Sequence, residues 1–296
     1  MQNPRPGTVQ LFQVRGISIF LHWSWLFVAV VEIQLRRQNY RSLAWNIAEY
    51  VALFAIVLLH ELGHAFACRS VGGLADHIIL WPLGGIAYVR PPPRPGALLW
   101  SVAAGPLVNL VLLPICVVAW HLTNGVVSHD LSRFFLALAY INGGLFIFNC
   151  LPVYPLDGGQ ILRALLWFVV GRARSLLVAS TIGLFGAAAV MAVALFYRQV
   201  WPAILAVFGG LRAWAGMRQA RALSVLLSAP VRAEFRCPAC LNSPPQGPYW
   251  RCGCGQIFDR FASPICPACF AINSPLICPH CGEDNPVERW SPRESP

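Results

Sequence analysis

Residues 53–67 read LFAIVLLHELGHAFA, an apolar segment that contains two histidines and one glutamate. Residues four apart project from the same face of a helix, so His60 and His64 can share one zinc ion. Glu61 lies beside them, where its carboxylate can accept a proton from water activated by that metal. Chance HExxH patterns occur in many helices, but polar groups inside a membrane helix are costly and are usually functional. The segment therefore predicts a zinc site within a membrane helix.

The composition of the whole chain favours a membrane protein. Of 296 residues, 57% are hydrophobic and only 11% are charged, less than half the charged share of an ordinary soluble domain. Apolar runs long enough for a crossing, about 20 residues each, predict six transmembrane helices near 17–35, 43–67, 97–121, 131–151, 175–197 and 200–220. A further apolar piece at 160–170 continues the fourth helix after a break.

Between the second and third apolar runs, residues 75–90 read ADHIILWPLGGIAYVR. Two short apolar runs around a Pro-Leu-Gly-Gly turn predict a small β-hairpin. Its outer strand has to be shielded by protein or water at membrane depth. The predicted fold is therefore an α-helical polytopic membrane protein with one hairpin between its second and third helices.

A catalytic zinc ion needs a third protein ligand and one open position. Residues 149–159 read NCLPVYPLDGG, and Asp157 is the only acidic residue between Asp130 and Glu234. Two prolines and two glycines interrupt the helix there, which lets a carboxylate point inward. The alternative is an ordinary loop aspartate, but that would not explain why Asp157 is expected at the same membrane depth as the two histidines. We therefore predict Asp157 as the third ligand.

These two motifs, about 90 residues apart, resemble those of the site-2 protease family of intramembrane metalloproteases, peptidase family M50. Residues 16–24 (GISIFLHWS) and 103–109 (AAGPLVN) resemble the first and third membrane segments of that family, so the resemblance covers about 14–170. It implies a six-helix enzyme whose buried zinc is reached by water from the cytoplasmic side. It also implies cleavage of transmembrane helices of membrane-anchored regulatory proteins.

The resemblance also assigns roles residue by residue. His60, His64 and Asp157 match the zinc ligands, and Glu61 matches the catalytic glutamate. Asn149 matches a motif asparagine that hydrogen-bonds either the substrate carbonyl or a neighbouring helix, and the sequence leaves both roles open. Because the ligand set is already complete, a structural or gating role is expected for His22, and close helix packing is expected around Gly105, Pro106 and Asn109. A helical substrate must unwind before hydrolysis, and the hairpin at 75–90 is predicted to hold it by adding a strand.

Eight of the eleven cysteines crowd into the last part of the chain. They form four short pairs: Cys237 and Cys240, Cys252 and Cys254, Cys266 and Cys269, and Cys278 and Cys281. Such pairs are typical of zinc ribbons, so we predict two structural zinc ions in a double zinc ribbon. Four disulfides in an exported tail are the alternative. Because the intervening loops are short, we expect the first two pairs to share one ion and the last two pairs the other.

Charge and periodicity predict a membrane-embedded metalloprotease domain at 1–221 and a zinc-ribbon domain at 222–296. The net charge of +10 belongs to the first part, which carries 16 arginines against six acids, whereas the second part is neutral. The basic balance suits loops that face anionic lipid, and the neutral tail favours a cytoplasmic protein partner over nucleic acid. Arginine counts in the loops predict cytoplasmic termini in the cell membrane, although the arginines at 36–41 oppose that orientation.

The function predicted from these patterns is a zinc endopeptidase that cuts within or near transmembrane segments. A catalytically inactive membrane scaffold that presents the ribbons is the first alternative, and all four catalytic positions argue against it. A metal transporter is the second alternative, which the adjacent Glu61 and the broken helix at Asp157 fit less well.

Overall fold

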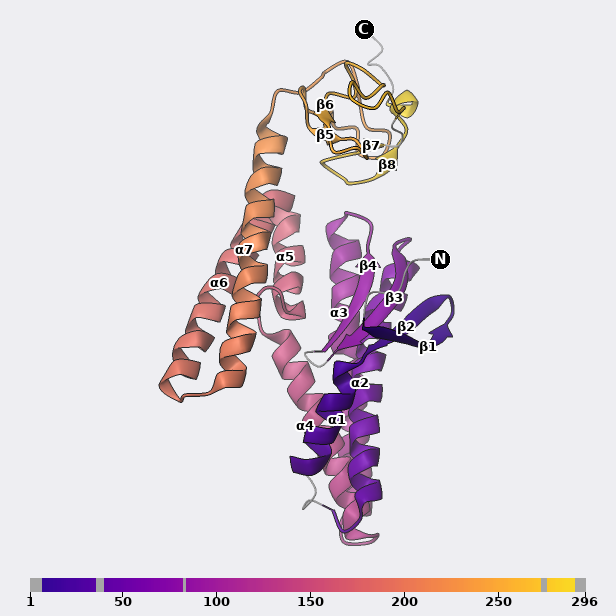
Figure 1. The fold of residues 1–296 in the computed structure, drawn as a ribbon, viewed down its shortest axis with the longest axis vertical. Helices are drawn as coiled ribbons and strands as arrows, with labels where there is room; N and C mark the ends of the chain where they lie inside the picture. The colour runs from indigo at the N-terminus through magenta and orange to yellow at the C-terminus, as the bar shows by residue number, and fades with distance from the viewer. Residues whose placement is uncertain (1–6, 36–39, 82–83, 273–275, 291–296) are drawn as a thin grey trace. The chain divides into compact units, whose positions relative to one another are not determined.

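The structure is a computed structural model that describes residues 7–35, 40–81, 84–272 and 276–290. It divides into two compact units (Figure 1). The first contains residues 1–91 and 96–162, and the second contains residues 92–95 and 163–296. The predicted boundary between 221 and 222 falls inside a helix, α7, that continues to Ser228. Whether residues 222–296 fold independently stays a prediction.

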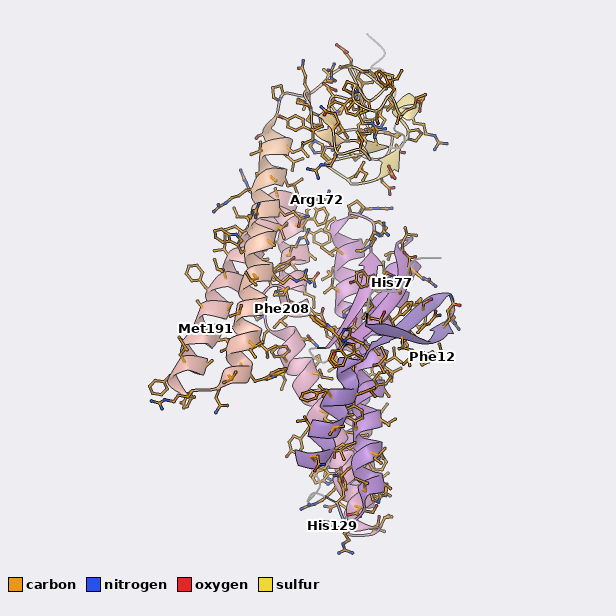
Figure 2. The ribbon with its side chains drawn as sticks, viewed as in Figure 1. Phe12, His77, His129, Arg172, Met191 and Phe208 are labelled. Carbon is orange, nitrogen blue, oxygen red and sulfur yellow. The ribbon has the colours of Figure 1, made fainter. Side chains whose placement is uncertain are left out.

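Seven α-helices lie in the described part of the chain. They are α1 (Ser24–Leu35), α2 (Leu43–Ser70), α3 (Pro95–Thr123), α4 (His129–Cys150), α5 (Asp157–Val170), α6 (Arg172–Phe196) and α7 (Val200–Ser228). Five of these described helices, α2, α3, α4, α6 and α7, are long and apolar enough to cross a membrane. Many large apolar side chains on them are exposed, as a lipid-facing surface requires (Figure 2). The prediction of an α-helical polytopic membrane protein is confirmed.

The first of the six predicted crossings takes a different form. Residues Ile17–His22 form strand β2, and only the 12 residues of α1 that follow are helical. A helix of that length rises about 18 Å, well short of the ~30 Å hydrocarbon core. The apolar run at 17–35 is thus a strand followed by a short helix. Residues 17–20 of the strand alternate buried and half-buried side chains with the period of two that a sheet imposes.

The predicted hairpin belongs to a larger sheet. Strands β1 (Thr8–Val14), β2, β3 (Leu74–Trp81) and β4 (Gly84–Arg90) lie in the order β1-β2-β3-β4. The hairpin is β3–β4, which pairs antiparallel, and β2 pairs parallel to β3. The turn residues 82–83 lie outside the described residues. Ile17, Ile19, Ile78 and Leu80 pack with Val57, Leu62 and Ala65 of α2 in one apolar core, which holds the sheet against α2.

A break separates α4 from α5 as the sequence predicts. Residues 151–156 contain two prolines, which cannot supply backbone N–H groups to a continuous helix. The chain turns through hydrogen bonds from Val153 N–H to Leu151 O and from Leu156 N–H to Val153 O. Helix α5 then starts at Asp157 itself. The break therefore fixes the position of the Asp157 carboxylate at a helix N-terminus.

The second unit contains the α6–α7 helical hairpin and a cysteine-rich segment. That segment has two small two-stranded sheets: β5 (Trp250–Arg251) with β6 (Ile257–Phe258), and β7 (Leu276–Ile277) with β8 (Asp284–Asn285). A short 3₁₀ helix, η1, spans Val287–Arg289. The main core of the segment comprises Cys237, Trp250, Leu276, Cys278 and Trp290, with Phe235, Phe261 and Val287 packed around them.

Candidate metal centres

The α2 histidines and the α5 aspartate form a tight triangle of ligand atoms. His60 Nε2 lies 3.1 Å from His64 Nε2 and 3.1 Å from Asp157 Oδ2, and His64 Nε2 lies 3.3 Å from the same carboxylate oxygen. Zinc bonds of about 2.0–2.1 Å in tetrahedral geometry separate neighbouring ligands by about 3.3 Å. The three atoms therefore match one face of a zinc tetrahedron, and the fourth vertex is left without a protein ligand among the described residues.

Both imidazole rings are oriented by hydrogen bonds from the opposite ring nitrogen. His60 Nδ1 donates to Asn109 Oδ1 at 2.5 Å, and His64 Nδ1 donates to the backbone carbonyl of Ser101 at 2.9 Å. With Nδ1 protonated, each ring turns the lone pair of its Nε2 towards the triangle. Such bonds fix the tautomer and orientation of metal-binding histidines, so the arrangement is prepared for a metal ion.

Helix α3 supplies this support through an asparagine pair. The Asn109 amide donates to Asn142 Oδ1 at 2.5 Å, and the Asn142 amide donates back to the Asn109 backbone carbonyl at 2.9 Å. Both asparagines are fully buried. A Cβ atom at Gly105, one turn earlier on α3, would collide with both imidazole rings. The segment at 103–109 thus allows the close helix packing that was predicted, but Asn109 also orients a ligand, which sequence reasoning missed.

Glu61 faces strand β4 as well as the triangle. Its Oε2 accepts a hydrogen bond from Ala87 N–H at 2.9 Å, and a Cβ atom at Gly85 would collide with its side chain. Strand β4 is the last strand in the sheet order, so its second edge is not paired to another strand of that sheet. Because the Ala87 N–H donates to Glu61, the backbone of β4 faces the glutamate at this residue.

Two other predicted positions lie outside the triangle. Asn149 is half-buried in the last turn of α4, and within the described residues it is not part of the hydrogen-bonded group around the histidines. His22 ends β2, where its Nδ1 lies 2.5 Å from Ser24 Oγ at the start of α1. The role of Asn149 and the structural or gating role expected for His22 both stay predictions.

The eight clustered cysteines form two groups of four. In the first, Cys237 Sγ lies 3.7 Å from Cys281 Sγ, and Cys240 Sγ lies 3.8 Å from Cys278 Sγ. In the second, Cys252 Sγ lies 3.5 Å from Cys269 Sγ, and Cys254 Sγ lies 3.7 Å from Cys266 Sγ. Tetrahedral zinc bonds of about 2.3 Å place sulfur atoms about 3.8 Å apart. A disulfide would hold them at about 2.05 Å, so both groups fit zinc and neither is disulfide-bonded.

The pairing predicted from the loop lengths is wrong. The first and last cysteine pairs share one site and the two middle pairs share the other. Loop length could not decide this, because 11 residues separate Cys240 from Cys252 and 11 also separate Cys254 from Cys266. Closing the 37-residue stretch between Cys240 and Cys278 costs only about 1 kcal/mol more than closing 11 residues. Burial of one aromatic side chain exceeds that cost, and Trp250 and Trp290 pack on the outer site.

All four cysteine pairs share one backbone geometry. The residue after the second cysteine of each pair has a positive φ: 60° at Leu241, 96° at Gly255, 57° at Phe270 and 70° at Gly282. Its N–H donates back to the carbonyl of the first cysteine in each pair. The left-handed residue reverses the chain, so that both sulfur atoms of a pair project to one side. Glycine adopts this conformation without strain at two of these positions.

Together these observations define an integral membrane protein with one candidate metal site of three side chains and two groups of four cysteines that could each hold a metal ion. The family model of peptidase family M50 matches residues 48–129 and 114–193, which include His60, His64 and Asp157. Zinc metalloprotease MJ0392 of Methanocaldococcus jannaschii is 34% identical over 177 residues, 60% of this chain and 50% of that protein. Stage IV sporulation protein FB of Bacillus subtilis is 33% identical over 117 residues, 38% of each chain.

The solved structure of a site-2 protease from Methanocaldococcus jannaschii has a TM-score of 0.52 and 29% identity, covering 71% of this chain and 95% of that one. The chain belongs to the site-2 protease family, peptidase family M50. It spans about half the length of the curated relative from the same archaeon.

Proposed function

We propose that the protein is an intramembrane zinc endopeptidase that hydrolyses peptide bonds within or near transmembrane segments. The observation that carries this proposal is the triangle of His60, His64 and Asp157 with Glu61 beside it on the same helix. A site with three protein ligands and one open position is the arrangement of catalytic zinc, whereas structural zinc has four.

Zinc at this site supplies Lewis-acid chemistry, which polarises a carbonyl and lowers the pKa of water. Glu61 is the side chain placed to take the proton from the attacking water and to pass it to the leaving amine. Its hydrogen bond to Ala87 N–H holds the carboxylate beside the triangle before substrate arrives. Asn109 accepts a hydrogen bond from His60 Nδ1 and so holds the His60 ring in one orientation during proton transfer to Glu61.

The free edge of β4 supports a mode of substrate binding. A transmembrane helix must unwind before its carbonyls are open to attack, because those carbonyls are hydrogen-bonded within the helix. An unwound segment that pairs with β4 would have its backbone amides satisfied at membrane depth. Glu61 already contacts the β4 backbone at Ala87. Strand addition there would therefore bring a peptide bond next to the proposed general base.

Glu61→Gln tests the proposal. It should abolish cleavage of a model transmembrane substrate in proteoliposomes while full metal content is kept, because all three ligands remain. General-base catalysis contributes roughly 10²–10⁴-fold. Glu49→Gln is the matched control, since Glu49 is also buried on α2 and accepts a hydrogen bond from Tyr40 at 2.5 Å. Turnover of Glu61→Gln within tenfold of the wild type would exclude Glu61 as the base.

We further propose that the cysteine-rich segment faces the cytoplasm and binds a protein, so that the enzyme acts in regulated intramembrane proteolysis. Thiolate zinc sites survive best in a reducing compartment. The second part of the chain is neutral by sequence, with six arginines against six acids after residue 221, so it offers little to nucleic acid. Deletion of residues 229–296 should leave cleavage of a short model substrate intact and impair processing of the native one.

Equal loss of activity on both substrates would place the segment within the catalytic fold instead. Reactivity of the cysteines with a membrane-impermeant thiol reagent, applied from each side after metal removal, tests the orientation. Labelling only from outside intact cells would overturn the cytoplasmic assignment.

A further inference from the structure

Asn142 lies in the middle of α4, in an apolar stretch that reads LAYINGGLFIF over residues 138–148. Its side chain is fully buried and is hydrogen-bonded to Asn109 of α3. A polar group inside a membrane helix is costly and usually has a function. The chemistry proposed for Glu61 and the metal does not use Asn142, so its role has to come from what it does to Asn109.

The side-chain amide of Asn109 has two different faces, because its oxygen can only accept a hydrogen bond and its nitrogen can only donate. Asn109 Oδ1 faces His60 Nδ1 at 2.5 Å, and Asn109 Nδ2 faces Asn142 Oδ1 at 2.5 Å. A half-turn of this amide would exchange the two faces. It would place the Asn109 oxygen against the Asn142 oxygen, where two acceptors meet, so Asn142 opposes the half-turn.

The orientation of Asn142 is fixed in turn by the backbone of α3. Asn142 Nδ2 donates to the backbone carbonyl of Asn109 at 2.9 Å. A backbone carbonyl can only accept, so the nitrogen of Asn142 has to face it, and the oxygen of Asn142 is then left for the Asn109 amide. Both asparagines are fully buried, so water cannot replace either hydrogen bond.

This order of hydrogen bonds decides which nitrogen of His60 carries the proton. With the Asn109 oxygen facing it, Nδ1 is protonated and Nε2 keeps its lone pair. With the amide nitrogen facing it, Nδ1 would have to accept, and the proton would move to Nε2, which could then bind no metal ion. We infer that Asn142 is a positioning residue that selects the metal-binding tautomer of His60 through Asn109. The inference rests on the zinc site of the proposed function.

The test measures the zinc affinity of the full-length protein in nanodiscs by competition with a fluorescent chelator. The membrane site is the part of the titration that is lost in His64→Ala. Asn142→Leu should lower the zinc affinity of that site about 10–100-fold, the range for residues that support a metal ligand. Asn142→Asp should keep most of the affinity, because a protonated carboxyl group still accepts from the Asn109 amide and still donates to the Asn109 carbonyl.

A second readout does not need the metal ion. Magic-angle-spinning NMR of protein labelled with ¹⁵N-histidine shows which imidazole nitrogens are protonated, and His60→Gln identifies the signals of His60. The wild type should carry the proton on Nδ1, and Asn142→Leu should move it towards Nε2. If the wild type binds no zinc that depends on His64, the proposed zinc site fails, and the NMR signals of His60 still decide this inference.

The Asn109→Asp background separates hydrogen bonding from packing. A carboxylate presents an acceptor to His60 whichever way it is turned, so its orientation needs no selection. Adding Asn142→Leu to Asn109→Asp should therefore cause no further loss of zinc affinity and no change of tautomer. Equal losses from Asn142→Leu in the two backgrounds would mean that Asn142 acts by packing alone, which would overturn the inference.

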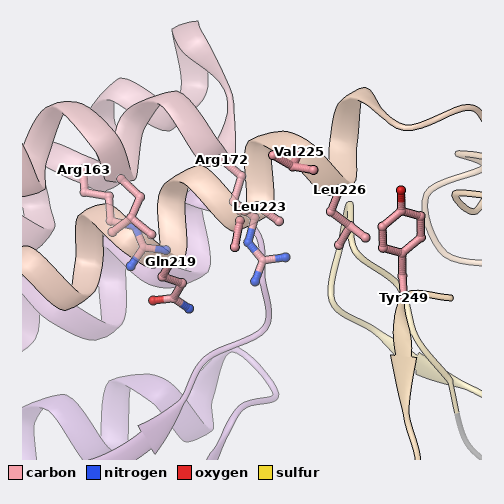
Figure 3. A pocket seen from close by; sticks show the side chains of 9 residues that line it. Arg163, Arg172, Gln219, Leu223, Val225, Leu226 and Tyr249 are labelled. Carbon is pink, nitrogen blue, oxygen red and sulfur yellow. The ribbon is translucent and has the colours of Figure 1, made fainter. Parts of the chain in front are cut away.

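Asn46→Leu is the matched control. Asn46 is a buried amide on α2, and neither polar atom of its side chain has a hydrogen-bond partner in the described part of the chain. Gln219→Leu is a second control, because Gln219 lines a cavity of about 370 Å³ in the second unit (Figure 3). Both controls should keep the zinc affinity and the His60 tautomer of the wild type. The same result in Asn142→Leu would also overturn the inference.

Discussion

The membrane metal centre and the two cysteine centres differ in how many ligands the protein supplies. His60, His64 and Asp157 offer three candidate ligand atoms that lie 3.1–3.3 Å apart, and each cysteine group offers four, with sulfur–sulfur distances of 3.5–3.8 Å. The first centre is supported by side chains and backbone of other helices, notably Asn109 and Ser101 on α3. The cysteine centres are supported by their own local turns.

This contrast teaches where the metal acts. The first site lies in a packed helical scaffold, so we expect its geometry to persist without a metal ion and its fourth position to be open for chemistry. The cysteine-rich segment has short strands and a small core, so we expect its fold to depend on the metal. Removing metal should therefore abolish activity at the membrane site and unfold the segment that contains the two cysteine groups.

Chelation should have the largest effect, and it should act on the cysteine-rich segment. Structural zinc contributes on the order of 10 kcal/mol or more to the folding of such small domains. A fragment of residues 229–296 should bind two zinc ions and unfold when they are removed, as followed by circular dichroism. The helices of the intact protein should keep their dichroism under the same treatment. A fragment that resists chelator but collapses on reduction would show that disulfides hold it.

Asp157→Asn should have the next largest effect, at the membrane centre alone. The amide is a much weaker ligand than the carboxylate, so metal affinity and cleavage should fall by more than the roughly 10–100-fold typical of changes to supporting residues. Asp130→Asn is the control, because Asp130 is a buried carboxylate that accepts a hydrogen bond from Arg41 N–H, away from the triangle. Competition with a fluorescent zinc chelator gives the affinity. Unchanged tight zinc and full activity in Asp157→Asn would remove it from the ligand set.

Asn109→Ala should lower metal affinity about 10–100-fold, because it frees the His60 ring. Asn149→Ala should leave metal affinity unchanged and lower turnover, if its amide hydrogen-bonds the substrate carbonyl. The two variants together separate a residue that positions a ligand from one that contacts substrate. A fall in zinc affinity in Asn149→Ala of the same size as in Asn109→Ala would contradict that division.

An effect on stability alone is expected at Asp259, which accepts several hydrogen bonds inside the cysteine-rich segment. Burial opposes its ionisation, but hydrogen bonds from Arg232 at 2.6 Å and from the backbone of Phe261 and Gly247 outweigh burial and lower the pKa of Asp259. Asp259→Asn should cost about 1–3 kcal/mol, measured by thermal unfolding of the zinc-loaded fragment.

The pH dependence of that cost has a definite sign. A carboxylate with a lowered folded-state pKa adds stability above its unfolded pKa of about 3.9, and this is lost only as the pH falls through the lower folded value. The difference between wild type and Asp259→Asn should therefore be constant from pH 6 to pH 8. A difference that changes across this window would mean that another group is being titrated.

The sequence predicts the membrane fold and the candidate ligands for local reasons. His60 and His64 are tied by the helical period, and the prolines and glycines around Asp157 require a helix break. Asn109 was missed as a supporting residue because the pattern AAGPLVN shows small residues for helix packing and says nothing of which side chain a neighbouring helix presents. A single asparagine in an apolar helix was the available signal.

Two other features depend on choices that are not local. Apolar run length cannot separate strand from helix at 17–22, where the partner strand β3 decides the matter. The cysteine pairing depends on an aromatic core assembled from Phe235, Trp250, Phe261 and Trp290, which are far apart in the chain. Loop lengths therefore cannot reveal a pairing that depends on contacts between distant aromatic residues.

The nested pairing of the cysteines also imposes an order on synthesis. The inner site is complete once Cys269 has been made, whereas Cys237 and Cys240 must wait for Cys278 and Cys281. During that interval Cys237 and Cys240 could pair wrongly with Cys252 and Cys254. The loop between Cys240 and Cys252 has 11 residues, as many as the loop between Cys254 and Cys266. If the inner site binds zinc early, Cys252 and Cys254 are no longer available to Cys237 and Cys240. We therefore expect zinc supply during translation to affect how many molecules reach this pairing.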